Sequence, residues 1–176
     1  MDDGDLKLIM KTIALVVCID TKQSEADYIC RKIREYNCRP LVIDTSTSPD
    51  YRSTADISRE DVSRAGGRDW SEMKGALKHD LLEWMCRGSA NIVNKLYYEK
   101  KIDGIFSCGG LQNTTIGANA MKNLPIGFPK FILSTVATGQ RTFDQIVGAK
   151  DITVMPSISD FAGINIVSKT VINNAV

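Results

Sequence analysis

The feature that most constrains the fold is an unbroken run of apolar, mostly β-branched residues from Thr12 to Ile19. A strand with one face in water alternates apolar and polar residues, whereas a strand buried on both faces of a parallel sheet is apolar throughout. The run ends at the polar triplet Asp20-Thr21-Lys22. We therefore expect a buried parallel strand whose carboxyl end carries polar side chains.

A helix and a second strand are predicted directly after this run. Ser24 can cap the helix, which ends near Asn37. Its buried face is predicted by apolar residues at helical spacing, namely Ala26, Ile29, Cys30 and Ile33. Pro40 to Ile43 then forms a short strand. The order is strand, helix, strand, and a right-handed crossover makes the two strands parallel.

The rest of the chain continues this alternation. Ser58 and Asp61 predict the start of a short helix that stops at Gly66-Gly67. A long helix is predicted from Trp70 to Lys100, in which Gly88-Ser89 can introduce a bend. Further strands are expected at residues 104–108, 130–134 and 151–155, and further helices at residues 114–122 and 158–173.

These elements predict an α/β fold, a Rossmann-like three-layer domain with a mostly parallel sheet of about five strands. Residues 1–10 are expected to form an N-terminal tail, and residues 11–176 a single Rossmann-like domain. A chain of this length can bury a continuous core without a disulfide or a metal.

Composition excludes several classes of partner. Lys and Arg number 22 against 21 Asp and Glu, so no net field draws the chain to nucleic acid or to an anionic membrane. The longest apolar run is too short to cross a bilayer, and the acidic start, Met1 to Asp5, is unlike a signal peptide. The five cysteines lack the spacing of a metal site, which indicates reduced thiols. We expect a soluble cytoplasmic protein without a metal cluster.

Four strand ends carry small polar residues or glycine, and open α/β sheets bind ligands at such ends, where the strand order reverses. These ends are Asp20-Thr21-Lys22, Thr45 to Ser48, Gly109 to Thr115 and Ser134 to Gln140. The Gly109-Gly110 turn is the most informative, because the helix after it presents free N–H groups to an anion. Thr114 or Thr115 can cap that helix or touch the bound group. The alternative is that the glycines only make a tight turn under a packed helix.

Charged side chains near these ends give weaker signals. Asp20 and Lys22 can contact a ligand or lie in a solvated turn, and Arg68 can bind a phosphate or remain a surface arginine. His79, the one histidine, is predicted on an exposed helix face. No candidate nucleophile has an activating base that the sequence reveals. Catalysis by this chain alone is therefore the function that we expect least.

Seven blocks of residues together resemble one known family. They are Thr12 to Lys22, Ala55 to Asp61, Gly104 to Gly110, Leu124 to Lys130, Ser134 to Gly139, Asp151-Ile152 and Asp160 to Asn165. In this order they resemble the N-terminal domain of the tomato mosaic virus resistance protein family, a two-domain family otherwise of uncharacterised function. The resemblance implies a Rossmann-like domain that binds a nucleotide, ATP in the plant members, and that associates as a homodimer. In the plant members it also implies binding to a viral replication protein.

The resemblance implies which residues contact the ligand. They are Asp20, Thr21, Lys22, Arg68, Gly109, Gly110, Leu111, Gln112, Asn113 and Thr114. The family's loop usually reads Gly-Gly-Ser-Gly-Gly-Thr, whereas Leu111, Gln112 and Asn113 stand where Ser, Gly and Gly are expected. Side chains thus occupy positions at which backbone alone would approach a phosphate.

The family's second domain is a barrel that resembles phosphoenolpyruvate-utilising enzymes. It is not in this chain, which stops at Asn173 to Val176, where the linker would begin. We therefore expect either a fragment or a stand-alone version. Three functions remain open: a non-catalytic, dimerising module that binds an ATP-like nucleotide or a phosphometabolite; half of a two-domain enzyme acting on a small phosphorylated or carboxylated substrate; and a protein-interaction module.

Overall fold

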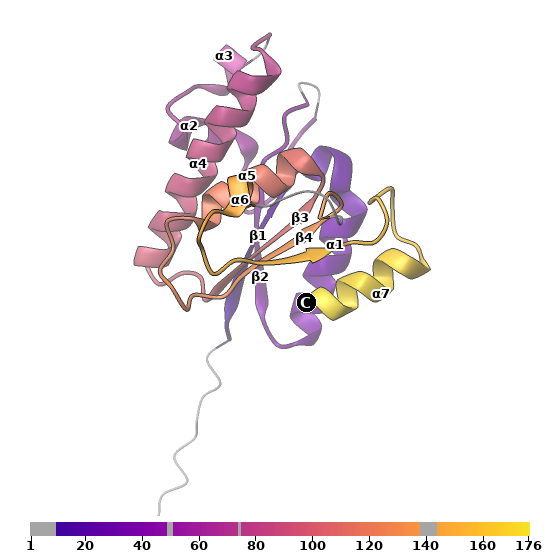
Figure 1. Ribbon diagram of the computed structural model, residues 1–176. Coiled ribbons are helices and arrows are strands. Elements are labelled where there is room, and N and C mark those ends of the chain that lie inside the picture. The colour runs from indigo at the N-terminus through magenta and orange to yellow at the C-terminus, as the bar shows by residue number, and fades with distance from the viewer. Residues whose placement is uncertain (1–9, 49–50, 74, 138–143) are drawn as a thin grey trace, which may run out of the picture.

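The computed structural model describes residues 10–48, 51–73, 75–137 and 144–176, and its centre is a five-stranded sheet (Figure 1). The strands are β1 (Thr12–Val17), β2 (Arg39–Asp44), β3 (Gly104–Gly109), β4 (Lys130–Ser134) and β5 (Thr153–Pro156). They pair in parallel in the order β2-β1-β3-β4-β5. The predicted Rossmann-like α/β fold is confirmed, and every pairing between these five strands is parallel.

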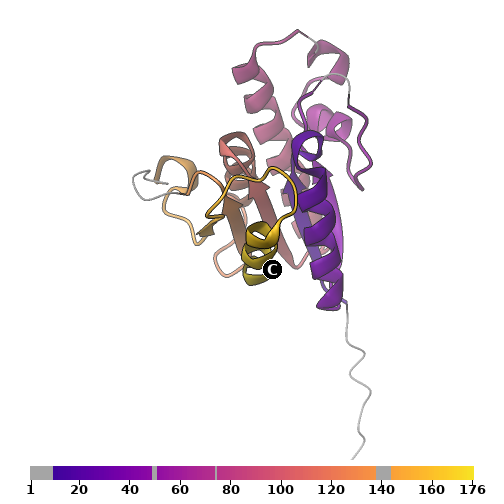
Figure 2. The same cartoon turned by 90° about the vertical axis from the view of Figure 1, so that its right-hand side faces the viewer.

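Helices cover both faces of the sheet, which makes three layers (Figures 1 and 2). On one face, α1 (Ile19–Glu35) and α7 (Ile166–Ala175) share a core with Leu15 and Val17. On the other face, α2 (Arg59–Ala65), α4 (Lys78–Tyr98) and α5 (Leu111–Met121) share a core with Ala14 and Val16. Successive side chains of β1 therefore enter different cores, which explains why the whole strand is apolar.

Helix α1 begins with a turn at Ile19; Lys22, whose backbone is not helical, separates this turn from the rest of the helix, which starts close to the predicted Ser24. The backbone N–H of Ile19 donates to Asp44 Oδ1, and that of Asp20 donates to Ser46 Oγ, at 3.4 and 2.9 Å. Side chains at the end of β2 thus satisfy the first N–H groups of the helix, which the local sequence does not cap. Asp20 therefore lies in the first turn of a helix rather than in a loop.

The long helix predicted from Trp70 to Lys100 is wrong, because α3 (Trp70–Met73) and α4 are separate helices. Gly75, between them, has a φ of +87°, a left-handed conformation that interrupts a helix and favours glycine. Helix α4 continues through Gly88, where it packs on α2: a Cβ here would lie 1.9 Å from the carbonyl oxygen of Val62. Gly88 therefore permits close helix packing.

Other predicted boundaries shift as well. Helix α5 begins earlier than predicted, with Gly110 as its N-cap, and α7 begins later, behind the capping residue Asn165. A short helix, α6 (Asp144–Val147), lies between β4 and β5. Residues 1–9 of the expected tail and residues 138–140 of the fourth strand-end loop lie outside the described residues. In the described ranges, no helix combines the length and the apolarity needed to cross a membrane.

Candidate functional site

A cleft lies at the carboxyl ends of β1, β2 and β3. The connection after β1 leads to β2 on one side, and the connection after β3 leads to β4 on the other, so the strand order reverses between β1 and β3. Open α/β sheets bind their ligands at such a point. The cleft has a volume of about 270 Å³ and is lined by Cys18, Asp20, Thr21, Lys22, Thr47, Gly110, Leu111, Gln112 and Asn113. The fold thus brings the predicted residues 20–22 and 110–113 together.

The N-terminus of α5 forms one wall of the cleft. Its N-cap, Gly110, offers no side chain to the helix. Among the described residues, none accepts a hydrogen bond from the backbone N–H groups of Leu111, Gln112 and Asn113. The first N–H groups of a helix lack an intrahelical acceptor and carry the positive end of the helix dipole. This wall therefore offers three backbone donors to an anion.

The side chain of Asn113 is turned away from the cleft and into the protein. Its Oδ1 accepts hydrogen bonds from Cys18 Sγ and Thr45 Oγ1, both at 3.2 Å. Its Nδ2 donates to the carbonyl oxygens of Val16 and Cys108. Asn113 therefore ties together the ends of three strands and leaves its backbone available, although glycine is expected at this position from the family's pattern.

Gln112 departs from the family's pattern in a different way, because its side chain reaches across the cleft. Its Nε2 donates to Thr47 Oγ1 at 3.2 Å and lies 3.8 Å from Cys18 Sγ. Leu111, by contrast, is half exposed. The side chains of Gln112 and Asn113 both bond to the segment after β2, Gln112 to Thr47 at the cleft and Asn113 to the buried Thr45.

Asp20 and Lys22 both hold loops of the protein as well as lining the cleft. Asp20 Oδ2 accepts hydrogen bonds from the backbone N–H groups of Thr47 and Ser48, at 3.2 and 2.9 Å. Lys22 Nζ donates to the carbonyl oxygen of Phe161, in the loop before α7. Two backbone N–H groups of the loop after β2 thus bind the carboxylate in charge-assisted hydrogen bonds, while the Lys22 ammonium adds a positive charge to the site.

The remaining predicted residues lie outside the cleft. Arg68 pairs with Glu72 at 3.2 Å, and its guanidinium lies 5.1 Å from the ring centre of Trp84. Thr114 Oγ1 lies 2.8 Å from Ser134 Oγ in a buried contact between α5 and β4, so it does not cap α5. Gly109 is buried at the end of β3. A ligand contact by any of the three would therefore need a change in these contacts.

The thiols near the cleft are poor nucleophiles. Burial raises the pKa of Cys18 to about 12, and burial also raises the pKa of Cys108. Both are therefore neutral at pH 7. His79 lies exposed on α4, and its Nε2 lies 3.1 Å from Asp80 Oδ1. Over the residues that the structure describes, no cluster of three or more His, Cys, Asp or Glu could hold a metal.

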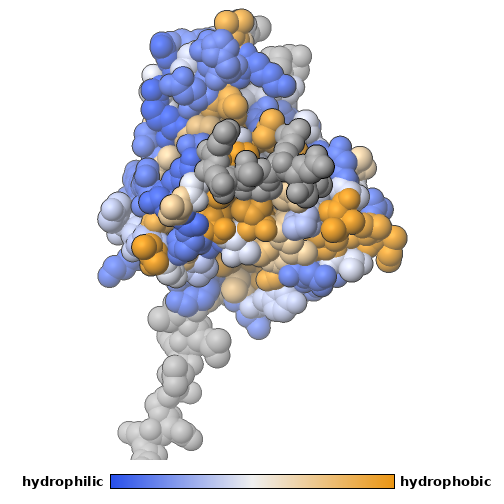
Figure 3. Space-filling model, viewed as in Figure 1, coloured by the Kyte–Doolittle hydropathy of each residue, from blue (hydrophilic) through white to orange (hydrophobic). Residues whose placement is uncertain are grey.

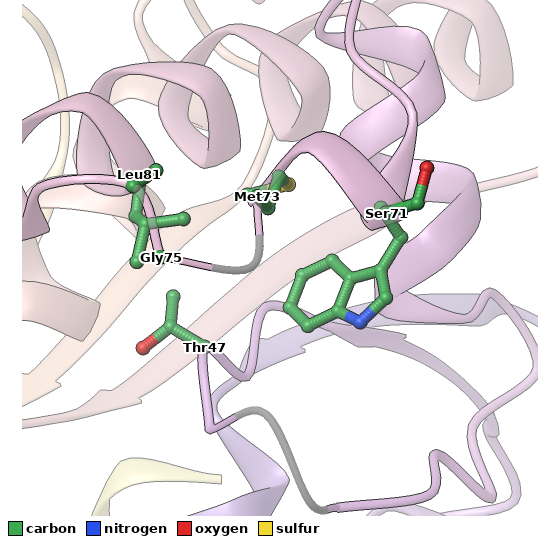
Figure 4. Close-up of a pocket in the computed structure, with 7 residues that line it drawn as sticks. Thr47, Ser71, Met73, Gly75 and Leu81 are labelled. Atoms are coloured by element: carbon green, nitrogen blue, oxygen red, sulfur yellow. The ribbon is translucent and has the colours of Figure 1, made fainter.

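A second pocket adjoins the cleft, and the sequence did not reveal it. Its volume is about 280 Å³, and Thr47, Trp70, Ser71, Met73, Gly75, Ala76 and Leu81 line it (Figure 4). The pocket exists because α3 and α4 are separate helices, whereas we predicted one. Thr47 lines both spaces, and the polar strand end at residues 45–48 was the one sequence signal that pointed to it.

Most of this chain matches a known protein family and several known proteins. Residues 11–176 match the model of the N-terminal domain of the uncharacterised protein family UPF0261. The chain belongs to this family. A UPF0261 protein of Clostridium tetani is 34% identical over 166 residues, which cover 94% of this chain and 41% of that protein. The ToMV susceptible protein tm-1(GCR26) of tomato is 31% identical over 179 residues, covering 91% of this chain and 24% of that protein.

The chain is also similar to the ToMV resistance protein Tm-1(GCR237) of tomato, with 43% identity over 77 residues, which cover 44% of this chain and 10% of that protein. The resemblance inferred from the sequence blocks is therefore confirmed. The chain spans less than half the length of these relatives.

Proposed function

We propose that this UPF0261 domain is a non-catalytic module that binds a phosphate-bearing small molecule, an ATP-like nucleotide or a phosphometabolite, in the cleft after β1, β2 and β3. The observation that carries the proposal is the group of three free N–H donors at the start of α5, in a cleft that Lys22 also lines. A helix N-terminus with free donors is suited to a phosphate group.

Charge and chemistry support a binding role over a catalytic one. The Asp20 carboxylate already accepts two backbone hydrogen bonds, which reduces its repulsion of an anion. The two buried thiols with raised pKa values cannot act as nucleophiles near neutral pH. The cleft thus combines three backbone donors and one ammonium with the hydrogen-bonded carboxylate of Asp20, and its described residues supply no activated nucleophile.

Thermal unfolding with ATP, other nucleotides and sugar phosphates tests this proposal. A ligand at about 100 times its Kd stabilises the folded state by about 2.7 kcal/mol, which raises the melting temperature by several degrees. Gly110→Asp should abolish this shift, because the new carboxylate caps the N–H groups of α5 and repels the phosphate. The backbone at Gly110 has a φ of −79°, which other residues also adopt, so the variant should fold.

Gly110→Ala is the matched control. A Cβ at this position would lie 3.7 Å from Thr135 Oγ1, an ordinary contact, and alanine leaves the donors free. The control should therefore keep the ligand-induced shift. Lys22→Ala should also reduce the shift, but Lys22 holds the Phe161 carbonyl as well, so the Gly110 pair is the cleaner test. If no nucleotide or sugar phosphate shifts the melting temperature of the unaltered protein, the proposal fails.

The second candidate is one half of a two-domain enzyme that acts on a small phosphorylated or carboxylated substrate. The observation in its favour is the greater length of a relative: the match to this chain covers only 41% of the Clostridium tetani protein. In that case a full-length relative should convert a compound that this domain only binds. Binding without turnover by the full-length relative, across the same panel, would argue for the non-catalytic module.

A further inference from the structure

A groove lies between α2 and α4, two helices that pack side by side on one face of the sheet (Figure 1). Its volume is about 550 Å³, compared with about 270 Å³ for the cleft. The two spaces have no lining residue in common. A role of the groove therefore does not depend on the ligand of the cleft.

The floor of the groove is apolar. It is formed by Ile57, Ala65, Ile92 and Leu96. Ile57 and Ile92 pack against the core but remain partly exposed. The transfer of apolar surface out of water is favourable, so this floor favours an occupant that covers it with apolar groups.

The rim of the groove carries more positive than negative charge. Arg64 pairs with Asp61 at 2.7 Å, and Lys101 pairs with Glu99 at 2.7 Å. Lys95 Nζ lies 3.9 Å from the same Glu99 carboxylate. Three cations thus share two carboxylates, and the side chains of the three cations are 60% to 74% exposed. The rim therefore favours an acidic occupant.

Residues 1–9 precede the described part of the chain and combine acidic with apolar side chains. Three aspartates and one lysine give this segment a side-chain net charge of −2. The aspartates lie at positions 2, 3 and 5, and the apolar residues after them are Leu6, Leu8 and Ile9. The segment therefore matches the groove twice, with apolar groups for the floor and negative charges for the rim.

The segment also starts close to the groove. The backbone N–H of Thr12 and the ammonium of Lys11 both donate to the Asp103 carboxylate, at 2.9 and 2.8 Å. Asp103 is two residues after Lys101, which lines the groove. Nine extended residues span at most about 30 Å. The groove follows α4 from Asn91 to Glu99, a length of about 12 Å at the helical rise per residue. The segment is therefore long enough to cross it.

We propose that residues 1–9 bind in the groove between α2 and α4 of the same molecule. The apolar residues of the segment cover the floor, and its aspartates lie among Arg64, Lys95 and Lys101. The segment then holds α2 and α4 together from outside. A tethered segment has an effective concentration of about 1 mM, so it is bound for about nine-tenths of the time if the free peptide has a Kd of about 100 μM.

Amide NMR of the ¹⁵N-labelled full chain and of a variant that lacks residues 2–9 tests the proposal. Strand β1 starts at Thr12, so the deletion leaves all five strands intact. The deletion should move the amide signals of Arg64, Ile92 and Lys95. A synthetic peptide of residues 1–10, added to the shortened variant, should return these signals toward their positions in the full chain, with a Kd of about 100 μM or below.

Variants test the two kinds of contact separately. Replacing both leucines of the peptide, Leu6→Ser and Leu8→Ser, should weaken its binding at least about tenfold, because apolar side chains lose their burial. Lys95→Glu in the shortened protein should weaken the unaltered peptide by about fivefold, since it reverses one exposed charge of the rim. Lys169→Glu is the matched control, an exposed position on α7, and should leave the affinity within about twofold.

Four outcomes would overturn the proposal. The first is that the deletion leaves the signals of α2 and α4 unchanged. The second is that it moves those of Ile33 and Phe131, which line an apolar cavity near the start of β1, because the segment would then bind there. The third is that Lys95→Glu and Lys169→Glu affect the peptide equally.

The fourth outcome concerns a second copy of the chain. Unlabelled full chain, mixed with the labelled shortened variant, should leave the signals of the shortened variant in place, because its own groove holds each segment. If the signals move to the positions of the full chain, the segment binds in the groove of another molecule, and the intramolecular contact is wrong.

Discussion

Lys130 is a charged residue whose side chain is completely buried, at the start of β4. Its ammonium donates to the carbonyl oxygens of Pro125 and Phe128, at 2.8 and 2.9 Å, and pairs with Asp151 at 2.8 Å. An ammonium is expensive to bury unless such partners replace its water. Lys130 therefore holds the turn before β4 against the segment before β5, and explains why the sequence block from Leu124 to Lys130 ends in a lysine.

Lys130→Met should lower the free energy of unfolding by about 2–4 kcal/mol, because two carbonyl groups and a carboxylate lose their donor. Lys11→Met is the matched control: Lys11 also pairs with an aspartate, Asp103, at 2.8 Å, but its side chain is 61% exposed. Lys11→Met should lower the free energy of unfolding by at most about 1 kcal/mol. Urea denaturation measures the free energy of unfolding of both variants. Equal losses of stability in the two variants would contradict this role of Lys130.

At the scale of secondary structure, the contact between α2 and α4 depends on the absence of a side chain. A Cβ at Gly88 would overlap the carbonyl oxygen of Val62, and the nearby Gly66 backbone is also within 3.0 Å of that position. The obstacle is backbone, which cannot move aside as a side chain can. The two helices can therefore pack at this distance only with glycine at position 88.

Gly88→Ala should destabilise the protein by about 3 kcal/mol or more, because it forces α2 and α4 apart. Gly75→Ala is the comparison. A Cβ at this position has no atom within 4 Å, so the variant should lose only about 1 kcal/mol of stability, from the strain of a side chain at a φ of +87°. Thermal denaturation of the two variants should show the larger loss for Gly88→Ala. A loss for Gly88→Ala no larger than that for Gly75→Ala would contradict the packing argument.

The strands of this fold and both ends of α2, which Ser58 and Gly66 cap as predicted, could be predicted from the sequence, whereas the first turn of α1 and the starts of α5 and α7 could not. The apolar run from Thr12 predicted β1 because burial on both faces leaves a local pattern. The start of α1 depends on Asp44 and Ser46, which are distant in sequence and reach the helix only after β2 has formed. The break between α3 and α4 had one local signal, Gly75 itself, and the helical spacing of the apolar residues around it favoured a continuous helix.

The candidate site could also be predicted only in part from the sequence. Strand-end reasoning placed residues 20–22 and 110–113 at one edge of the sheet, and the structure brings them into one cleft. It could not show that Asn113 turns inward while Gln112 crosses the cleft, because both directions depend on partners in other strands and loops. The second pocket, lined by Trp70, depends on Arg59, which packs two segments together that are separate in the chain.

At the scale of the whole molecule, an apolar surface lies over α7 (Figure 3). Ile166 is 80% exposed and Val167 is 41% exposed on this helix. We propose that this surface contributes to a homodimer, the association that the family resemblance implies. Sedimentation velocity at micromolar concentration should give the mass of a dimer, and Ile166→Glu should reduce it to a monomer. A monomeric mass for the unaltered protein would contradict the proposed dimer.

Amide NMR tests most directly the phosphate site that we propose at the N-terminus of α5. Titration of the ¹⁵N-labelled protein with ATP should move the backbone amide signals of Leu111, Gln112 and Asn113 with one saturable curve, because these are the free donors of α5. Gly110→Asp should abolish those shifts. If the three amides stay unchanged while ATP binds, or if saturable shifts appear only elsewhere in the protein, the account of this cleft as the phosphate site is wrong.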